Sequence, residues 1–197
     1  MELVSNRLVG MVLMTGSVLF LFAAFMPYSR VFMENEPAAR LDIINQRLTQ
    51  WNIGQVLFAL GSLVAALGLG FLLLRYRGSA AGNWARVGTV LLLAGAVLWT
   101  WHCMERLISP EGFVNGTLTP YLFTVYSIFT QAGLICFGIF LLWTDLSGWT
   151  GWMLIAGTGI ICVLYIIFKD MPPFVYYVFT LVLAIKLMAQ AGVNTVL

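Results

Sequence analysis

Six apolar segments, each long enough to cross a lipid bilayer, are the feature that most limits how this chain can fold. They cover about residues 8–26, 53–74, 86–103, 120–143, 150–168 and 174–192. About 20 apolar residues are needed, because the hydrocarbon core is about 30 Å thick and a helix rises about 1.5 Å per residue. Strands are excluded because no segment alternates with period 2. The sequence predicts an all-α, polytopic integral membrane protein: one transmembrane domain over residues 1–197, a bundle of six transmembrane helices.

Composition favours a membrane protein over a soluble one. Hydrophobic residues make up 61% of the chain and charged residues 9%, whereas soluble domains contain about 45–50% and about 25%. A water-soluble fold of this size lacks the polar surface to cover so many apolar side chains. The net charge of +2, with no basic run, argues against nucleic acid as a partner. We therefore expect the lipid bilayer, in the cell membrane, as the surroundings.

The first loop contains an amphipathic segment of its own, at about residues 37–51. Pro37 suits the first turn of a helix. The apolar residues that follow at spacings of three and four are Leu41, Ile44, Leu48 and Trp51, while Arg40 and Arg47 lie off that stripe. This pattern predicts an interfacial helix lying on the membrane surface. Alternatively, the segment continues into the next span as one rod, because no proline intervenes.

Arginine and lysine counts give the orientation. Six spans place both termini on one face, with the loops at 75–85 and 144–149, and the loops at 27–52, 104–119 and 169–173 on the other. The two faces carry similar numbers of basic residues. The segment after the first helix pair carries Arg75, Arg77 and Arg86 and no acid, which predicts cytoplasmic termini by the positive-inside rule.

Glycines indicate how the helices pack. Gly54, Gly61 and Gly68 recur every seven residues, so they share one helical stripe where a neighbouring backbone can approach closely. Gly157 and Gly159 flank Thr158 near the middle of another span. That triplet is either a break exposing backbone groups, as in some transporters, or a point of close helix contact.

Polar residues within the spans suggest a vestibule. Tyr121, Thr124, Ser127 and Gln131 form one helical stripe, and Gln131 lies about 16 Å inside the span, near the bilayer midplane. Four more residues lie in the same half of the membrane: Gln55, Trp99, Tyr176 and Thr180. One explanation is a water-accessible cavity open toward the loops at 27–52, 104–119 and 169–173. The other is an interfacial aromatic belt with a few interhelical hydrogen bonds.

The stretch WTWHCMER holds the only histidine and the catalytic candidates His102, Glu105 and Arg106. A histidine and a carboxylate three residues apart can transfer protons near neutral pH. No metal-ligand spacing is present, so no metal site is predicted, and the cofactor stays open. The competing interpretation is a charged helix exit, in which tryptophans lie at the headgroups and Glu105 neutralises Arg106.

Lys186 is the remaining charge within a span. A lysine at that depth either lines a functional cavity or extends its side chain to the surface on the side of the termini.

Three classes of function fit these patterns. The first prediction is a non-catalytic membrane subunit or accessory protein that packs against other membrane chains or a second copy, because charges in the spans are scarce and catalytic motifs absent. The first alternative is a small-solute transporter, channel or lipid- or small-molecule-binding bundle that uses the vestibule. The second is a membrane enzyme acting on a lipid or quinone-like substrate through His102, Glu105 and Arg106.

Overall fold

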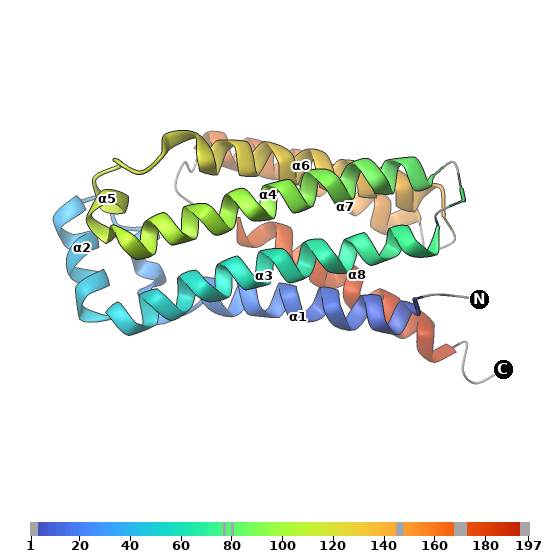
Figure 1. The fold of residues 1–197 in the computed structure, drawn as a ribbon, viewed down its shortest axis with the longest axis horizontal. Coiled ribbons are helices and arrows are strands. Elements are labelled where there is room, and N and C mark those ends of the chain that lie inside the picture. Colours follow the sequence, from blue (N-terminus) through green and yellow to red (C-terminus); the bar gives the residue numbers. More distant parts are fainter. Residues whose placement is uncertain (1–3, 77, 80, 145–147, 168–172, 194–197) are drawn as a thin grey trace.

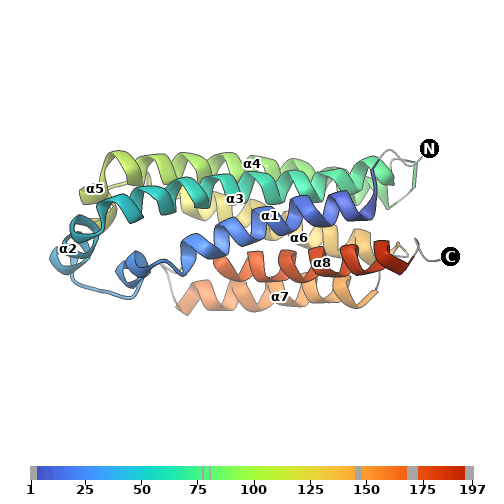
Figure 2. The ribbon, with the colours of Figure 1, turned by 90° about the horizontal axis from the view of Figure 1, so that it is seen from below.

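The computed structural model describes residues 4–76, 78–79, 81–144, 148–167 and 173–193. All regular structure in these ranges is helical. The long helices are α1 (Asn6–Ala24), α3 (Leu48–Arg75), α4 (Gly82–Ile108), α6 (Pro120–Leu142), α7 (Gly148–Ile167) and α8 (Phe174–Val193). The short ones are η1 (Pro27–Phe32), α2 (Pro37–Gln46) and α5 (Pro110–Val114). Figures 1 and 2 show the long helices side by side in one elongated bundle.

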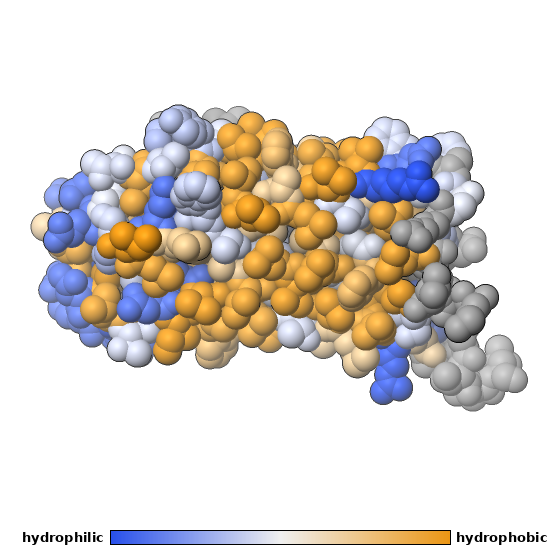
Figure 3. All heavy atoms as spheres, viewed as in Figure 1, coloured by the Kyte–Doolittle hydropathy of each residue, from blue (hydrophilic) through white to orange (hydrophobic). Residues whose placement is uncertain are grey.

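Five helices are long and apolar enough to cross a membrane: α1, α3, α4, α6 and α8. The apolar part of α7, Trp149–Leu164, is shorter. In Figure 3, hydrophobic side chains cover the middle of the molecule and hydrophilic ones gather at its ends. The structure therefore fits an integral membrane protein built as a helical bundle, with five helices of spanning length and a shorter apolar helix in place of the sixth predicted span.

The helices form a ring around the core. Helix α1 packs against α3 and α8, α3 against α4, α4 against α6, and α6 against α7, which also contacts α8. The described ends nearest the two termini lie at one end of the bundle, and α2 and α5 cover the opposite end (Figure 1). We call the covered end the α2/α5 end. It is the end on which the loops at 27–52 and 104–119 were predicted to meet.

The predicted glycine stripe of α3 faces α1 and η1. A Cβ at Gly68 would lie 2.9 Å from the backbone nitrogen of Leu13, and one at Gly54 would overlap the ring of Tyr28. Gly61 meets the α1 backbone at similarly short range. The stripe is therefore a seam of close helix contact, as small residues commonly form in membrane bundles.

The other crossings use glycines as well. A Cβ at Gly88 of α4 would lie 3.0 Å from the carbonyl oxygen of Gly133 of α6. In α7, Gly157 packs against Phe179, whereas a Cβ at Gly159 would meet nothing within 4 Å. Helix α7 is unbroken through this region, so the transporter-like break is not observed.

Two helix boundaries differ from those predicted. The amphipathic helix ends at Gln46 rather than residue 51, because Arg47 leaves helical geometry, with φ −132° and ψ 33°. Helix α3 begins at Leu48, so the prediction of one continuous rod is also wrong. Helix α2 packs against η1 and α5 instead of lying only on a membrane surface, and this contact buries Ile44.

Helix α4 continues to Ile108, beyond the predicted end at residue 103. The WTWHCMER segment is therefore helical throughout and forms part of the last turns of α4. A serine then stops the helix: the Oγ of Ser109 accepts a hydrogen bond from the backbone N–H of Gly112 and caps α5. Helix α5, which the sequence analysis did not predict, brings Phe113 back over the bundle end.

Candidate functional site

An aromatic cluster fills the α2/α5 end. The ring of Phe113 lies 5.2 Å from that of Trp51 and 6.0 Å from that of Phe32, measured between centroids. Trp51 also stacks edge-on against Tyr28 at 5.6 Å. The indole N–H of Trp51 donates to the carbonyl oxygen of Arg106 over 3.3 Å. These contacts tie η1, α3, α4 and α5 together and fix the position of Phe113.

Two buried arginines flank Phe113. Arg106 of α4 is 4% exposed and Arg40 of α2 is 8% exposed. Each guanidinium carbon lies 4.6 Å from the centroid of the Phe113 ring, and that of Arg106 lies 5.2 Å from Trp99. Cations at these distances are attracted to the ring faces. Arg40 was predicted to lie off the buried stripe, which is wrong: helix α2 turns it inward.

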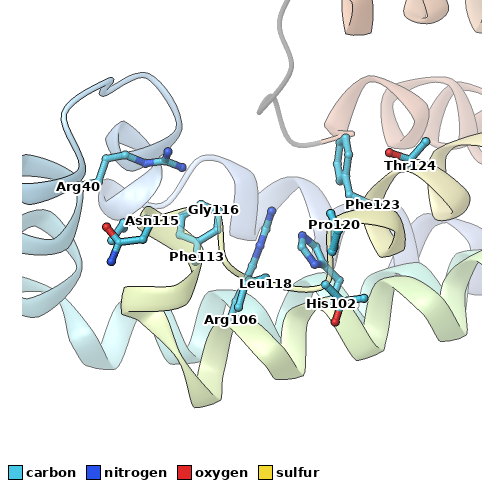
Figure 4. Close-up of a pocket in the computed structure, with 12 residues that line it drawn as sticks. Arg40, His102, Arg106, Phe113, Asn115, Gly116, Leu118, Pro120, Phe123 and Thr124 are labelled. Carbon is cyan, nitrogen blue, oxygen red and sulfur yellow. The ribbon is translucent and has the colours of Figure 1, made fainter.

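A cavity of about 450 Å³ opens beside these arginines. Its wall comes from α2, α4, α5, the loop that follows α5 and the start of α6; it includes Arg40, His102, Arg106, Phe113, Phe123 and Thr124 (Figure 4). The described residues that line it include two guanidinium groups and no carboxylate. The described part of the wall therefore combines two guanidinium groups with aromatic rings.

His102 belongs to this wall. The side chain is 7% exposed and is flanked by the rings of Trp99 at 5.7 Å and Phe123 at 6.1 Å. Figure 4 shows its imidazole next to the guanidinium end of Arg106. Its Nδ1 is buried and has no hydrogen-bond partner among the described residues. This nitrogen is therefore enclosed by the surrounding side chains rather than open to the cavity.

Glu105 serves another purpose. Its carboxylate accepts hydrogen bonds from the backbone N–H of Thr119 at 3.1 Å, the Oγ1 of Thr119 at 2.6 Å and the indole N–H of Trp101 at 3.2 Å. The predicted neutralisation of Arg106 by Glu105 is therefore wrong. The carboxylate anchors the chain entering α6, and Glu105 is not among the residues that line the cavity with His102.

The predicted stripe on α6 does not line a single cavity. Thr124 lies on the cavity wall, Tyr121 is 66% exposed and Ser127 is buried. Gln131 accepts a hydrogen bond from the Sγ of Cys162 at 2.7 Å, which joins α6 to α7. The stripe therefore faces several neighbours in turn.

Two other vestibule candidates lie deeper in the bundle. Tyr176 and Thr180 line a separate internal cavity of about 20 Å³. The Oγ1 of Thr180 is 2.8 Å from the Oγ of Ser17, and the hydroxyl groups of Tyr126 and Tyr177 are 3.3 Å apart. These bonds link α1, α6 and α8. We interpret the second cavity as a polar packing centre.

Gln55 and Trp99 are both fully buried. Both amide atoms of Gln55 and the indole nitrogen of Trp99 have no hydrogen-bond partner within the described ranges. The indole of Trp99 lies between Arg106, which is on the wall of the 450 Å³ cavity, and Tyr126, whose ring is 4.7 Å away in the interior. Neither residue lines the larger cavity.

Lys186 lies near the other end of the bundle. Its ammonium nitrogen is 5.1 Å from the ring centroid of Trp149, at the start of α7. Because Trp149 lies at the end of the bundle near the two termini, this contact favours the interpretation in which the lysine side chain extends toward that end.

In comparisons with protein-family models, curated proteins and solved structures, none matches the chain significantly. The fold and the site therefore define the class by themselves: a helical membrane bundle with an arginine- and aromatic-lined cavity at one end.

Proposed function

We propose that this protein binds a small molecule in the cavity at the α2/α5 end, as a membrane-embedded binding bundle. The observation that carries this proposal is the cavity of about 450 Å³. Ligand sites in proteins are typically about 300–1,000 Å³, largely apolar, and supplied with a few convergent polar groups. Phe113 and Phe123 supply the apolar wall, and His102, Arg40 and Arg106 supply the polar groups.

For this function we propose a protein of the cell membrane with six spans, of which α7 is one. Both termini then lie in the cytoplasm. Burial of Arg40 and Arg106 supports that orientation, because it leaves Arg30 and Arg47 as the exposed arginines described at the α2/α5 end. At the other end, Arg7 and Arg86 are exposed in the first turns of α1 and α4. Reporter fusions at the C-terminus and in the loop at 144–149 test the orientation, since both should report the cytoplasmic side.

Mass spectrometry of the extracted protein tests the binding function. The protein is extracted in a mild detergent and washed, and the molecules released on denaturation are measured. We expect a stoichiometric molecule that is enriched over the bulk lipid. The variant Thr124→Phe narrows the cavity and should deplete that molecule. The matched variant Ile128→Phe, at an exposed position of the same helix outside the cavity, should retain it.

A wild-type protein that holds no molecule enriched over the bulk lipid would contradict the proposed function. So would equal retention by both phenylalanine variants.

A non-catalytic accessory subunit is the second candidate. It is supported by Gly159 on α7, which is exposed and has open space around it, as a helix contact with another membrane chain would require. The same extraction tests it, because a subunit should leave the membrane as a stoichiometric complex with other chains or with a second copy. An acid–base enzyme gains less support, because Glu105 bonds Thr119 instead of joining His102 at the cavity.

A further inference from the structure

We propose that the end of the bundle opposite the α2/α5 end binds the phosphate head group of an anionic phospholipid. The contact surface consists of Lys186 of α8 with Trp149 and Trp152 of α7, and we call it the Lys186 surface. This inference goes beyond the proposed function, because the cavity lies at the other end of the molecule.

The distribution of charge is the first argument. The carboxylates of the described residues all lie at the α2/α5 end: Glu34, Glu36, Asp42, Glu105 and Glu111. Within the described ranges, the opposite end has no carboxylate, and its basic side chains include Arg7, Arg86 and Lys186. A partner that contacts this end is therefore expected to carry negative charge.

The environment of Lys186 is the second argument. Its ammonium nitrogen lies 5.1 Å from the ring centroid of Trp149. An indole face attracts a cation, but it does not neutralise the charge or occupy all three N–H donors. In the described part of the chain, the ammonium group forms no hydrogen bond and no ion pair. It is therefore available to phosphate oxygens, which lysine commonly binds in proteins.

The tryptophans indicate the depth of this lysine in the membrane. Trp149 is 56% exposed and Trp152 is 62% exposed. They are three residues apart and so lie on neighbouring parts of the α7 surface. The apolar part of α7 begins at Trp149, and tryptophans are enriched where the hydrocarbon core meets the head groups. The ammonium group of Lys186 therefore lies at the level of the lipid phosphates.

The adjoining helix surface suits an acyl chain. Helices α7 and α8 contact each other less extensively than α7 contacts α6 or α8 contacts α1. Farther along α7, Ile160 and Val163 share the exposed side of Trp149, and Ile185 is exposed next to Lys186 on α8. A chain attached to a phosphate at Lys186 can lie along this apolar surface. These features favour a phospholipid over an acidic protein segment.

Unselective contact with the membrane is the alternative. In it, Lys186 extends its side chain to whichever head groups are present, and a zwitterionic lipid occupies the surface as well as an anionic one. A basic residue near a membrane surface strengthens binding to anionic lipid by about fivefold. The two interpretations therefore differ in lipid selectivity, which can be measured.

The test is native mass spectrometry of the full chain in a neutral sugar detergent. Phosphatidylglycerol and phosphatidylcholine with the same acyl chains are added in equal amounts, and the lipids that stay bound are counted. We expect the protein to retain phosphatidylglycerol at least about fivefold more than phosphatidylcholine.

Three variants locate the binding. Lys186→Gln should lower the preference for phosphatidylglycerol by about fivefold, whereas Lys186→Arg keeps the charge and should retain it. The matched variant Arg30→Gln removes an exposed arginine at the α2/α5 end and should bind both lipids as the wild type does. Equal retention of the two lipids by the wild type, or a preference that Lys186→Gln leaves unchanged, would overturn the proposal.

A third probe, the soluble acidic peptide hexaglutamate, separates the two kinds of anionic partner. If hexaglutamate binds in a way that depends on Lys186 and phosphatidylglycerol does not, the surface belongs to an acidic protein segment and the lipid assignment is wrong. A phospholipid held at Lys186 should be depleted by Lys186→Gln and retained by Thr124→Phe. A molecule held in the cavity should show the opposite pattern, so this proposal and the proposed function fail separately.

Discussion

The crossing of α1 and α3 offers a quantitative test of how this bundle is held together. At Gly61, an added Cβ would lie 2.7 Å from the backbone nitrogen of Phe20, 2.8 Å from the carbonyl oxygen of Gly16 and 2.9 Å from the Cβ of Phe20. The first two are backbone atoms of α1, so no side-chain rotation relieves the overlap. The substitution Gly61→Ala must push the two helices apart.

The size of the effect follows from these distances. Ordinary contact of a Cβ begins at 3.4 Å, so the helices must separate locally by several tenths of an ångström. Overpacking of this kind costs about 1–3 kcal/mol. Alanine also has a higher helix propensity than glycine, by up to about 1 kcal/mol, which partly offsets the cost. A control variant with the same propensity gain is therefore needed.

Gly159→Ala is that control, because an added Cβ there meets nothing within 4 Å. Equilibrium unfolding in mixed micelles should give Gly61→Ala a free energy of unfolding about 1–3 kcal/mol below that of Gly159→Ala. The comparison cancels helix propensity and isolates the packing at the crossing. Equal stabilities of the two variants would refute the close approach of α1 and α3 described here.

Three further predictions concern the candidate site and its surroundings. Glu105→Gln should lower the free energy of unfolding by about 1–2 kcal/mol, measured by chemical unfolding. Thr119→Val should lower it by less, because the backbone N–H of residue 119 still donates to the carboxylate. Gln131→Leu should leave ligand binding unchanged and cost about 0.6 kcal/mol, because Gln131 bonds Cys162 and does not line the cavity; lost binding would contradict this placement. Burial raises the pKa of Tyr28 above its usual value of 10.0, so the unfolded chain loses this proton first and stability falls as the pH rises above that value. Melting temperatures between about pH 9 and pH 11 should therefore drop less for Tyr28→Phe than for the wild type.

The long helices could be predicted from the sequence because the bilayer imposes their length. The glycine stripe of α3 could also be predicted, because Gly54, Gly61 and Gly68 repeat with a helical period and have no other purpose in lipid. The shorter elements could not. Helix α5 has five residues, too few for a periodic pattern, and the bend at Arg47 has no proline or glycine to mark it.

The α6 stripe shows why a polar pattern alone does not locate a cavity. Thr124 and Gln131 share one face of the helix, yet Thr124 meets the cavity and Gln131 meets α7. A stripe on a long helix passes more than one neighbour, because packed helices cross at an angle. Helical periodicity shows which residues share a face of their own helix. It does not show which neighbouring helix or cavity that face contacts.

Arg40 and Arg106 are the most instructive pair, because charge suggested exposure for both. Arg40 is four residues before Ile44, so it shares the buried side of α2, and that spacing was visible in the sequence. The prediction failed because burial of an arginine depends on aromatic rings supplied from elsewhere in the chain. Phe113 comes from α5 and faces both guanidinium groups, while Arg106 also lies over Trp99. The burial of a charged side chain therefore depends on which elements the fold brings together, and a periodic pattern within one helix does not contain that information.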